Sequence, residues 1–207
     1  MYESKILSNI KLPVFSLSDV SKLTKSRNYA KVILFRMVKE KTLFRLRKDR
    51  YSFSSNPLVY SPYLNYPSYV SCASALSYHG LISQIPNNVF LMTLKRPKSI
   101  KNLIYHKTKY FFGYDKVKIN GVNTFIADKE KAFIDSIGIH PLNLIIEALP
   151  LLDEEKLLDY AKRTNQLKRI SYLLKKEVKV SNKYIFLDPL AKKIGSKDKK
   201  WKLIVNC

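Results

Sequence analysis

The chain opens with a hydrophobic pattern that predicts helices followed by a strand pair. A first short helix is expected over Tyr2–Ile10. A second is predicted over Asp19–Leu23, where Ser18 serves as N-cap and Asp19 suits the positive end of the helix dipole. After a break at 24–26, apolar residues recur at helical spacing and predict a longer helix over 26–40. These apolar residues are Ala30, Ile33, Leu34 and Met37.

A basic hairpin is predicted next. Residues 43–47 alternate apolar Phe44 and Leu46 with arginines, as in a half-buried strand, and Tyr51–Phe53 supplies the second strand. The turn between them is 48–50. Helices, a tight turn, a longer helix and a basic hairpin follow one another in the order typical of a winged helix-turn-helix. We assign this domain to residues 1–56.

The segment that follows is uncharged and rich in proline and tyrosine, and we predict a linker at 57–67. The tyrosines of this segment, together with the next tyrosine along the chain, fall at a spacing of three. The prolines argue against a single helix. Two interpretations remain for them: rings that clamp the linker onto the domains, or a stacking platform for single-stranded nucleic acid. The tyrosines are Tyr60, Tyr63, Tyr66 and Tyr69.

Residues 68–207 alternate helical and strand patterns and predict a mixed α/β domain. The fold class is therefore α+β: an N-terminal winged helix-turn-helix followed by this second domain. Helices are expected over Tyr69–Tyr78, Lys129–Ile137, Leu142–Leu149 and Glu154–Lys176. Strands are expected over Val89–Leu94, Lys116–Ile119, Thr124–Ala127, Tyr184–Leu187 and Trp201–Val205, the second and third forming a hairpin around Asn120-Gly121.

Charge adds a partner class to this picture. The 207 residues include 38 Lys and Arg against 16 Asp and Glu, a formal net charge of +22. Hydrophobic content of 46% is ordinary for a chain that folds around a core. Such a charge on a folding chain indicates a polyanionic partner. The first 56 residues are the most densely basic, with 13 basic and 4 acidic residues.

Several classes are excluded by composition. Two cysteines, Cys72 and Cys207, make neither a disulfide framework nor a CxxC zinc motif, so we expect no metal site. The first residues lack the apolar core of a secretory signal, and no 18-residue apolar run exists. We therefore expect a cytoplasmic protein with no membrane association.

The predicted longer helix supplies the candidate base contacts. In a helix-turn-helix, the N-terminal residues of the second helix reach base edges in the major groove. Arg27 can pair with guanine and Asn28 with adenine. Lys25, Ser26, Tyr29 and Lys31 suit phosphates, which fix the register of the protein on DNA. The hairpin residues expected on the adjacent DNA backbone are Arg47, Lys48 and Arg50.

Six short sequence blocks span most of the chain: FSLSDVSKLT, NYAKVILFRMVKEKTLFRLRKDRYSF, YVSCASALSYHGLISQIP, FIADKEKAFID, YIFLDPL and GSKDKKWKLIVN. Together they resemble the AbiEi family of antitoxins and transcriptional regulators from prokaryotic type IV toxin–antitoxin systems. The resemblance implies an N-terminal domain that binds double-stranded DNA at its own promoter. It also implies a second domain with antitoxin activity against a nucleotidyltransferase-like toxin, acting functionally without a required physical complex.

Catalytic patterns are weak, and we expect no enzyme activity, no catalytic residue and no cofactor. His79 beside Gly80 is typical of a helix end. Residues 128–131 have the residue types of a nuclease without the spacing, and we expect Glu130, Lys131 and Asp135 on a solvated helix face. The Glu154-Glu155-Lys156 run has the spacing but opens an amphipathic helix.

The leading hypothesis is thus a sequence-specific autorepressor that also acts as an antitoxin, as a monomer or a dimer. The alternatives are a stand-alone DNA-binding regulator without a toxin, a nucleic-acid-processing enzyme or its accessory subunit, and a basic scaffold that binds a protein toxin directly.

Overall fold

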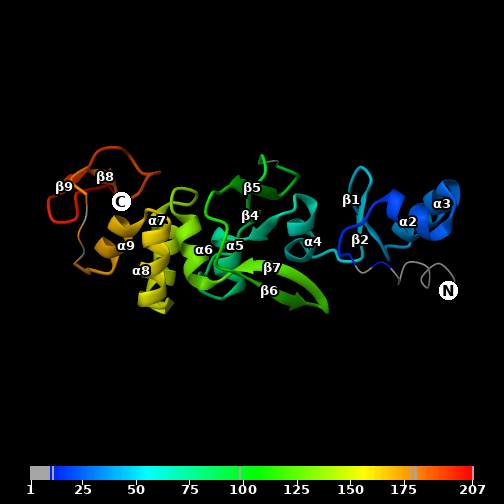
Figure 1. Cartoon of the computed structure of the whole chain (residues 1–207), viewed down its shortest axis with the longest axis horizontal. Coiled ribbons are helices and arrows are strands. Elements are labelled where there is room, and N and C mark those ends of the chain that lie inside the picture. Colours follow the sequence, from blue (N-terminus) through cyan, green and yellow to red (C-terminus); the bar gives the residue numbers. More distant parts are fainter. Residues whose placement is uncertain (1–9, 11, 98, 178, 180, 207) are drawn as a thin grey trace. The chain divides into compact units, whose positions relative to one another are not determined.

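A computed structural model describes residues 10, 12–97, 99–177, 179 and 181–206, and its architecture is α+β (Figure 1). The chain forms two compact units. Unit 1 comprises the described part of Met1–Tyr66 together with Val117–Thr124, and unit 2 comprises the described parts of Pro67–Lys116 and Phe125–Cys207. The helix predicted over Tyr2–Ile10 lies outside the described residues except for Ile10.

Unit 1 contains the predicted helix pair and hairpin. Its elements are α2 (Leu17–Thr24), α3 (Arg27–Lys39), β1 (Phe44–Arg47), β2 (Arg50–Ser52) and α4 (Pro57–Leu64). The strands β1 and β2 pair antiparallel, and the backbone of Phe15 exchanges hydrogen bonds with that of Tyr51 at 3.0 and 2.9 Å. The segment before α2 thus joins the edge of the hairpin.

One face of α3 forms the centre of the core of unit 1. Ala30, Ile33, Leu34 and Met37 are buried at helical spacing, as the sequence predicts. They pack with apolar residues from the segment before α2, from α2 and from the start of the hairpin. These partners are Phe15, Val20 and Leu43.

Residues 57–64 form helix α4, in place of the predicted linker. Pro57 occupies the first turn, where its fixed φ suits a helix and no N–H is required, and Asn56 caps the N–H of Leu58 at 2.9 Å. Pro62, inside the helix, cannot donate to the carbonyl of Leu58. The hydroxyl of Thr124 donates to that carbonyl instead, at 2.7 Å. A residue distant in sequence therefore satisfies the bond that proline removes.

Unit 2 contains most of a five-stranded sheet of order β5-β4-β3-β7-β6. Strand β3 pairs antiparallel with β4 and parallel with β7, and β4 pairs parallel with β5. A second sheet has the order β8-β10-β9. The strands are β3 (Ser68–Val70), β4 (Val89–Thr93), β5 (Leu103–Lys107), β6 (Tyr114–Ile119), β7 (Val122–Ala127), β8 (Ile185–Phe186), β9 (Ser196–Asp198) and β10 (Leu203–Val205).

The helices of unit 2 depart from the predicted pattern at three places. The helix predicted from Tyr69 begins only at Cys72, because Tyr69 and Val70 pair with neighbouring strands in β3. The helix predicted over Leu142–Leu149 is α-helical to Ile145 and continues as a 3-10 helix. The helix predicted over Glu154–Lys176 is two helices, because Asn165 adopts a left-handed conformation (φ 60°) and ends the first. The N–H of Gln166 then bonds to the carbonyl of Ala161 at 2.8 Å. The elements are α5 (Cys72–Tyr78), α6 (Lys129–Ser136), α7 (Leu142–Ile145), the 3-10 helix η1 (Ile146–Leu151), α8 (Glu154–Arg163) and α9 (Leu167–Leu173).

Helix α6 is buried from Glu130 to Ser136, which corrects the expectation of a solvated face at Glu130, Lys131 and Asp135. The Lys131 side chain is 0% exposed and forms an ion pair with Asp135, one turn later. Its ammonium also donates to the hydroxyl of Tyr69 at 3.0 Å. The other Asp135 oxygen accepts from the hydroxyls of Tyr69 (2.9 Å) and Ser71 (2.8 Å). The pair therefore joins α6 to β3 and to the start of α5.

Burial changes the acid–base properties of this network. Burial raises the pKa of Asp135, while Lys131 and the hydroxyl donors act in the opposite direction. Burial also raises the pKa of Tyr69, and the Asp135 carboxylate raises it further. Burial also raises the pKa of the neighbouring Cys72 thiol, which donates to the backbone oxygen of Asp135 at 3.4 Å. The hydroxyls of the network thus stay protonated donors and hold the carboxylate in place.

We predict that Asp135→Asn lowers the free energy of unfolding of unit 2 by about 3–5 kcal/mol, because it leaves the Lys131 charge buried and unpaired. Urea titration followed by fluorescence of Trp201, the only tryptophan and part of unit 2, measures this change. Tyr69→Phe, which removes two hydrogen bonds and keeps the ion pair, is the milder control at about 2 kcal/mol. Equal losses for the two variants would contradict a dominant ion pair.

Candidate nucleic-acid interface

The turn between α2 and α3 is fixed by side-chain caps at both helix starts. Ser16, not the predicted Ser18, caps α2, and Asp19 returns the bond to the Ser16 N–H at 2.8 Å. Those hydrogen bonds hold the pKa of Asp19 below its usual value. Lys25 ends α2 in a left-handed conformation (φ 54°), and the Ser26 hydroxyl accepts from the N–H of Tyr29 at 3.3 Å. The left-handed Lys25 and the Ser26 cap therefore fix the residue at which α3 begins.

Opposite its buried face, α3 presents a line of exposed residues. Asn28, Val32, Phe35 and Lys39 are spaced by four, three and four residues, so they share one side of the helix. We call these four residues the outer row of α3. Phe35 is 74% exposed, more than any other aromatic side chain that the structure describes, and Val32 is 49% exposed.

The structure brings the predicted contacts on α3 together at its N-terminal end. Arg27, Asn28 and Lys31 are exposed on the first turns of the helix, and Lys25 is exposed in the turn before it. Ser26 is exposed but serves as N-cap, while Tyr29 is 40% exposed on the flank of the outer row. Val32 and Phe35 lie on the same surface and are not among the DNA contacts predicted from the sequence.

The hairpin residues have different environments. Lys48 is exposed at the tip. Arg47 is half-buried and its guanidinium donates to the carbonyl of Leu64 at 3.3 Å. Arg50 donates to the carbonyl of Asp49 at 2.8 Å and lies 3.6 Å from its carboxylate, whose other oxygen accepts from the N–H of Leu17 at 2.9 Å. The Arg47 and Arg50 side chains thus bond to the protein and stabilise the hairpin. The Lys48 side chain at the tip is exposed to solvent.

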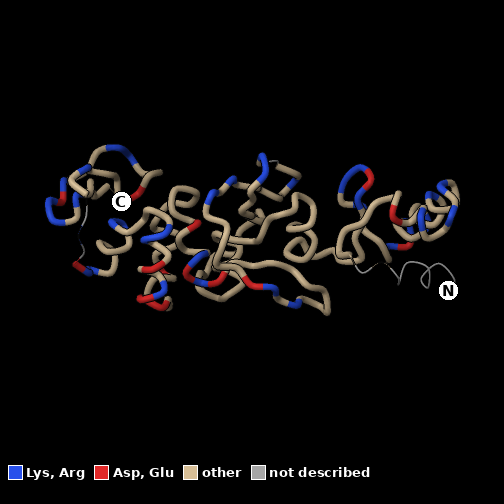
Figure 2. The backbone as a smooth tube through the Cα atoms, viewed as in Figure 1, with Lys and Arg blue, Asp and Glu red and all other residues tan. Residues whose placement is uncertain are grey.

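Positive charge dominates this part of unit 1. Residues 17–50 contain 11 Lys and Arg against 3 Asp and Glu, and Figure 2 shows the blue segments along α3 and at the tip of the β1–β2 hairpin. Two of the three acids, Asp19 and Asp49, bind backbone N–H groups. The exposed surface is therefore suited to a phosphate backbone.

A second basic segment lies near the C-terminus, in unit 2. Residues 162–207 carry 14 Lys and Arg against 3 Asp and Glu, half of the net charge of the chain. A hollow of about 430 Å³ there is lined by Lys162, Lys168, Lys179 and Lys183 among other residues. The neighbouring lysines and partial burial lower the pKa of Lys168, with burial the larger cause.

The residues weighed as nuclease candidates form a structural ion-pair network. Lys156 lies 2.9 Å from Glu130 and 3.2 Å from Asp128, and Tyr160 donates to Asp128 at 2.8 Å. Burial raises the pKa of Glu130, but the bonds from Lys156 and the Asp153 N–H outweigh it and lower that pKa. Burial and the bond to Asp128 raise the pKa of Tyr160 to about 12. Asp128 also caps α6 through the N–H of Lys131 at 2.8 Å.

The three histidines have structural surroundings. His79 ends α5, as predicted, and its Nε2 lies 2.8 Å from the carbonyl oxygen of Ala127. His106 and His140 both pack on the Phe90 ring, at centroid distances of 6.2 and 4.4 Å. Within the described part of the chain, the buried Nε2 of each has no hydrogen-bond partner. Burial lowers the pKa of both.

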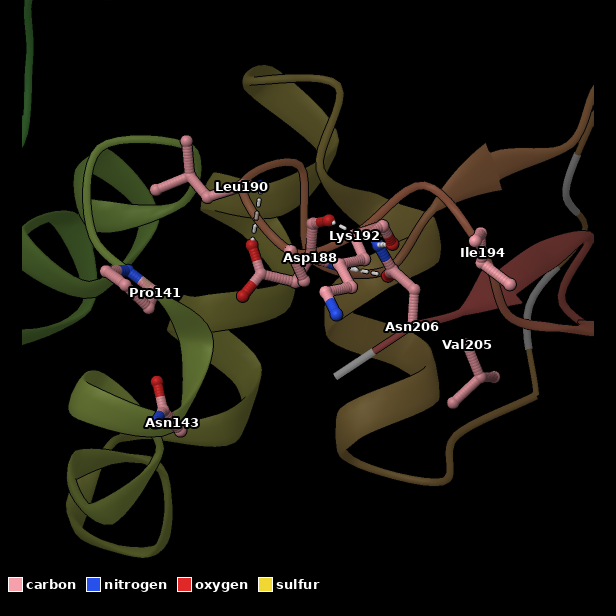
Figure 3. A pocket seen from close by; sticks show the side chains of 9 residues that line it. Pro141, Asn143, Asp188, Leu190, Lys192, Ile194, Val205 and Asn206 are labelled. Atoms are coloured by element: carbon pink, nitrogen blue, oxygen red, sulfur yellow. Dashed lines mark hydrogen bonds between the residues drawn. The ribbon is translucent and has the colours of Figure 1, made fainter.

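An open pocket of about 690 Å³ in unit 2 is shown in Figure 3. Two of its polar side chains bond to the protein itself. Asp188 accepts from the N–H groups of Leu142 and Leu190, both at 2.8 Å. The Asn206 amide donates to the carbonyls of Asp188 (2.9 Å) and Lys192 (3.0 Å). The side chains of Asn143 and Lys192 also line the pocket, and the rest of its wall is apolar.

The described residues contain no group of three or more His, Cys, Asp and Glu side chains placed to hold a metal ion. None of their helices combines the length and the apolar character needed to cross a membrane.

Comparison with known proteins yields a fold likeness. No family model and no curated protein matches the chain. The crystal structure of the RV2827C protein from Mycobacterium tuberculosis is similar, with a TM-score of 0.60 over 98% of this chain and 89% of that chain. The sequences are 12% identical over the alignment. At this identity the likeness concerns the fold alone.

We predict that unit 2 loses stability as the pH falls from 7.5 to 5. Because burial holds the folded-state pKa values of His106 and His140 below the ordinary histidine value of about 6.5, their contribution to stability is present above about pH 6.5 and is lost as the pH falls through the folded values. Urea unfolding followed by Trp201 fluorescence across this range measures the slope. The double variant His106→Phe/His140→Phe is expected to flatten it, and an unchanged slope would refute the assignment.

Proposed function

We propose that this chain is a sequence-specific DNA-binding transcriptional regulator, with unit 1 as its winged helix-turn-helix domain. The observation that carries the proposal is the arrangement of α3: one face is buried in the core, and the opposite face is exposed, basic at its N-terminal end and free of carboxylates until Glu40. The hairpin β1–β2 and its bridge to the segment before α2 support a wing beside that helix.

In this proposal each residue class has a separate role. Arg27 and Asn28 read guanine and adenine edges in the major groove. Lys25, Tyr29 and Lys31 contact phosphates, and Ser26 holds the helix start in register. Lys48 contacts the adjacent backbone, whereas Arg47 and Arg50 support the hairpin that carries it.

The resemblance to AbiEi antitoxins extends the proposal to unit 2. We propose that the regulator represses its own promoter and that unit 2 counteracts a nucleotidyltransferase-like toxin. Co-expression with a nucleotidyltransferase encoded beside it tests this part. Restored growth supports an antitoxin, while continued growth arrest leaves a stand-alone regulator.

A gel-shift titration with the DNA upstream of its own gene tests DNA recognition. We expect tighter binding to this duplex than to a scrambled duplex of equal composition, and a log–log salt slope of about −5 if six cations each neutralise a phosphate. Equal affinity for both duplexes would refute sequence-specific binding.

Two variants separate base reading from phosphate binding. We expect Arg27→Ala to lose about 1–3 kcal/mol of preference for the upstream duplex, because one bidentate base contact is removed. Lys48→Ala is expected to weaken binding to both duplexes alike and to reduce the salt slope by about 1. If Arg27→Ala also weakened both duplexes alike, its base-reading role would be wrong.

A further inference from the structure

The outer row of α3 combines polar ends with an apolar centre. Asn28 and Lys39 stand at its ends, and Val32 and Phe35 lie between them with exposed fractions of 49% and 74%. Tyr29, 40% exposed, adjoins Val32 on the flank. Isolated apolar side chains on a surface are ordinary. Here they are contiguous and occupy the middle of the face that the proposed function places in the groove.

The charges around this apolar centre indicate which class of molecule binds there. Lys31, Arg36 and Lys39 are exposed on the same helix. A groove of about 130 Å³ beside Phe35 is lined by Lys31 and Arg45 together with apolar residues, and no carboxylate lines it. Duplex DNA matches this arrangement, because its phosphates are anionic while the 5-methyl of thymine is the apolar group in the major groove.

Resting on the proposed function, we propose that Phe35 and Val32 determine specificity by contacting thymine methyl groups, so that the operator is rich in A·T pairs beneath the outer row. The row spans about 16 Å from Asn28 to Lys39 at 1.5 Å per residue, the rise of about five base pairs. Phe35 lies about 10 Å along the axis from Asn28. The thymine under Phe35 is therefore about three base pairs from the adenine that Asn28 reads.

The test begins with duplexes selected from a random-sequence library by binding to the full chain. Each thymine of the selected site is then replaced by uracil, which lacks only the methyl group. At one position we expect binding to weaken about fourfold, equivalent to about 0.8 kcal/mol for one buried carbon group. The original duplex, with thymine (5-methyluracil) at every such position, is the reference for each measurement.

Variants at Phe35 assign the effect to its ring. At the position under Phe35, Phe35→Ala is expected to bind the thymine and uracil duplexes with equal affinity, and Phe35→Leu to retain a preference for thymine. Tyr66→Ala is the matched control, because Tyr66 is an exposed aromatic residue of unit 1 outside α3 (57%), and it should leave the ratio unchanged.

The outcomes distinguish this inference from the proposed function. Site-specific binding with equal affinity for thymine and uracil duplexes at every position would overturn the thymine contact and leave DNA recognition intact. Failure to select any site would overturn the proposed function itself. If sedimentation showed a dimer that Phe35→Ala converts to monomer, with an unchanged thymine ratio, the apolar centre would be an interface between two copies and the inference would be wrong.

Discussion

The packing of one face of α3 against the core of unit 1 determines what the other face can do. Ile33 and Leu34 are almost completely buried, and the helical period then directs Asn28, Val32 and Phe35 away from the core. Rotation of α3 by one residue would expose Leu34 and bury a polar or charged neighbour, which the free energy of side-chain burial disfavours. The composition of the exposed face is therefore a direct consequence of core packing.

Unit 2 depends on a different kind of interaction, a buried ion pair. Lys131 and Asp135 lie one turn apart on α6, and the hydroxyls of Tyr69 and Ser71 complete the hydrogen bonding of the carboxylate. Gly113, with φ of 68°, lies so close to the Lys131 side chain that a Cβ there would be 3.0 Å from it. Apolar residues could fill the same space without the desolvation cost. What the pair adds is a set of directional hydrogen bonds from α6 to Tyr69 of β3 and to Ser71.

The sequence predicts elements whose pattern is local. The buried positions of α3, the hairpin and the β6–β7 turn at Asn120-Gly121 all follow from periodicity and turn chemistry within a few residues. The outer row was available from the same periodicity, since residues at i, i+4 and i+7 share a side. Of the four residues, Asn28 alone is a predicted base contact, because the predicted contacts are hydrogen-bonding side chains at the N-terminal end of the helix.

Other features depend on partners distant in sequence, and local reasoning missed them. Helix α4 needs the hydroxyl of Thr124 to replace the donor that Pro62 lacks. Lys131 and Asp135 have the spacing of a solvated i, i+4 pair, and only the position of Tyr69, 62 residues from Lys131, shows that they are buried. The break between α8 and α9 is different in kind, because Asn165 is itself a recognised residue type for a left-handed helix end.

The positions of the acidic residues say more about the basic surface of unit 1 than the size of the net charge does. In residues 17–50, Asp19 and Asp49 are directed at backbone N–H groups that hold α2 and the hairpin. They stabilise the scaffold and leave the cations of α3 with little nearby negative charge. Such a surface repels itself in the free protein. A polyanion bound across it would relieve that repulsion and would bind the folded state in preference to the unfolded one. Under the proposed function, the same placement of acids that builds unit 1 would therefore couple its stability to a partner with regularly spaced negative charge.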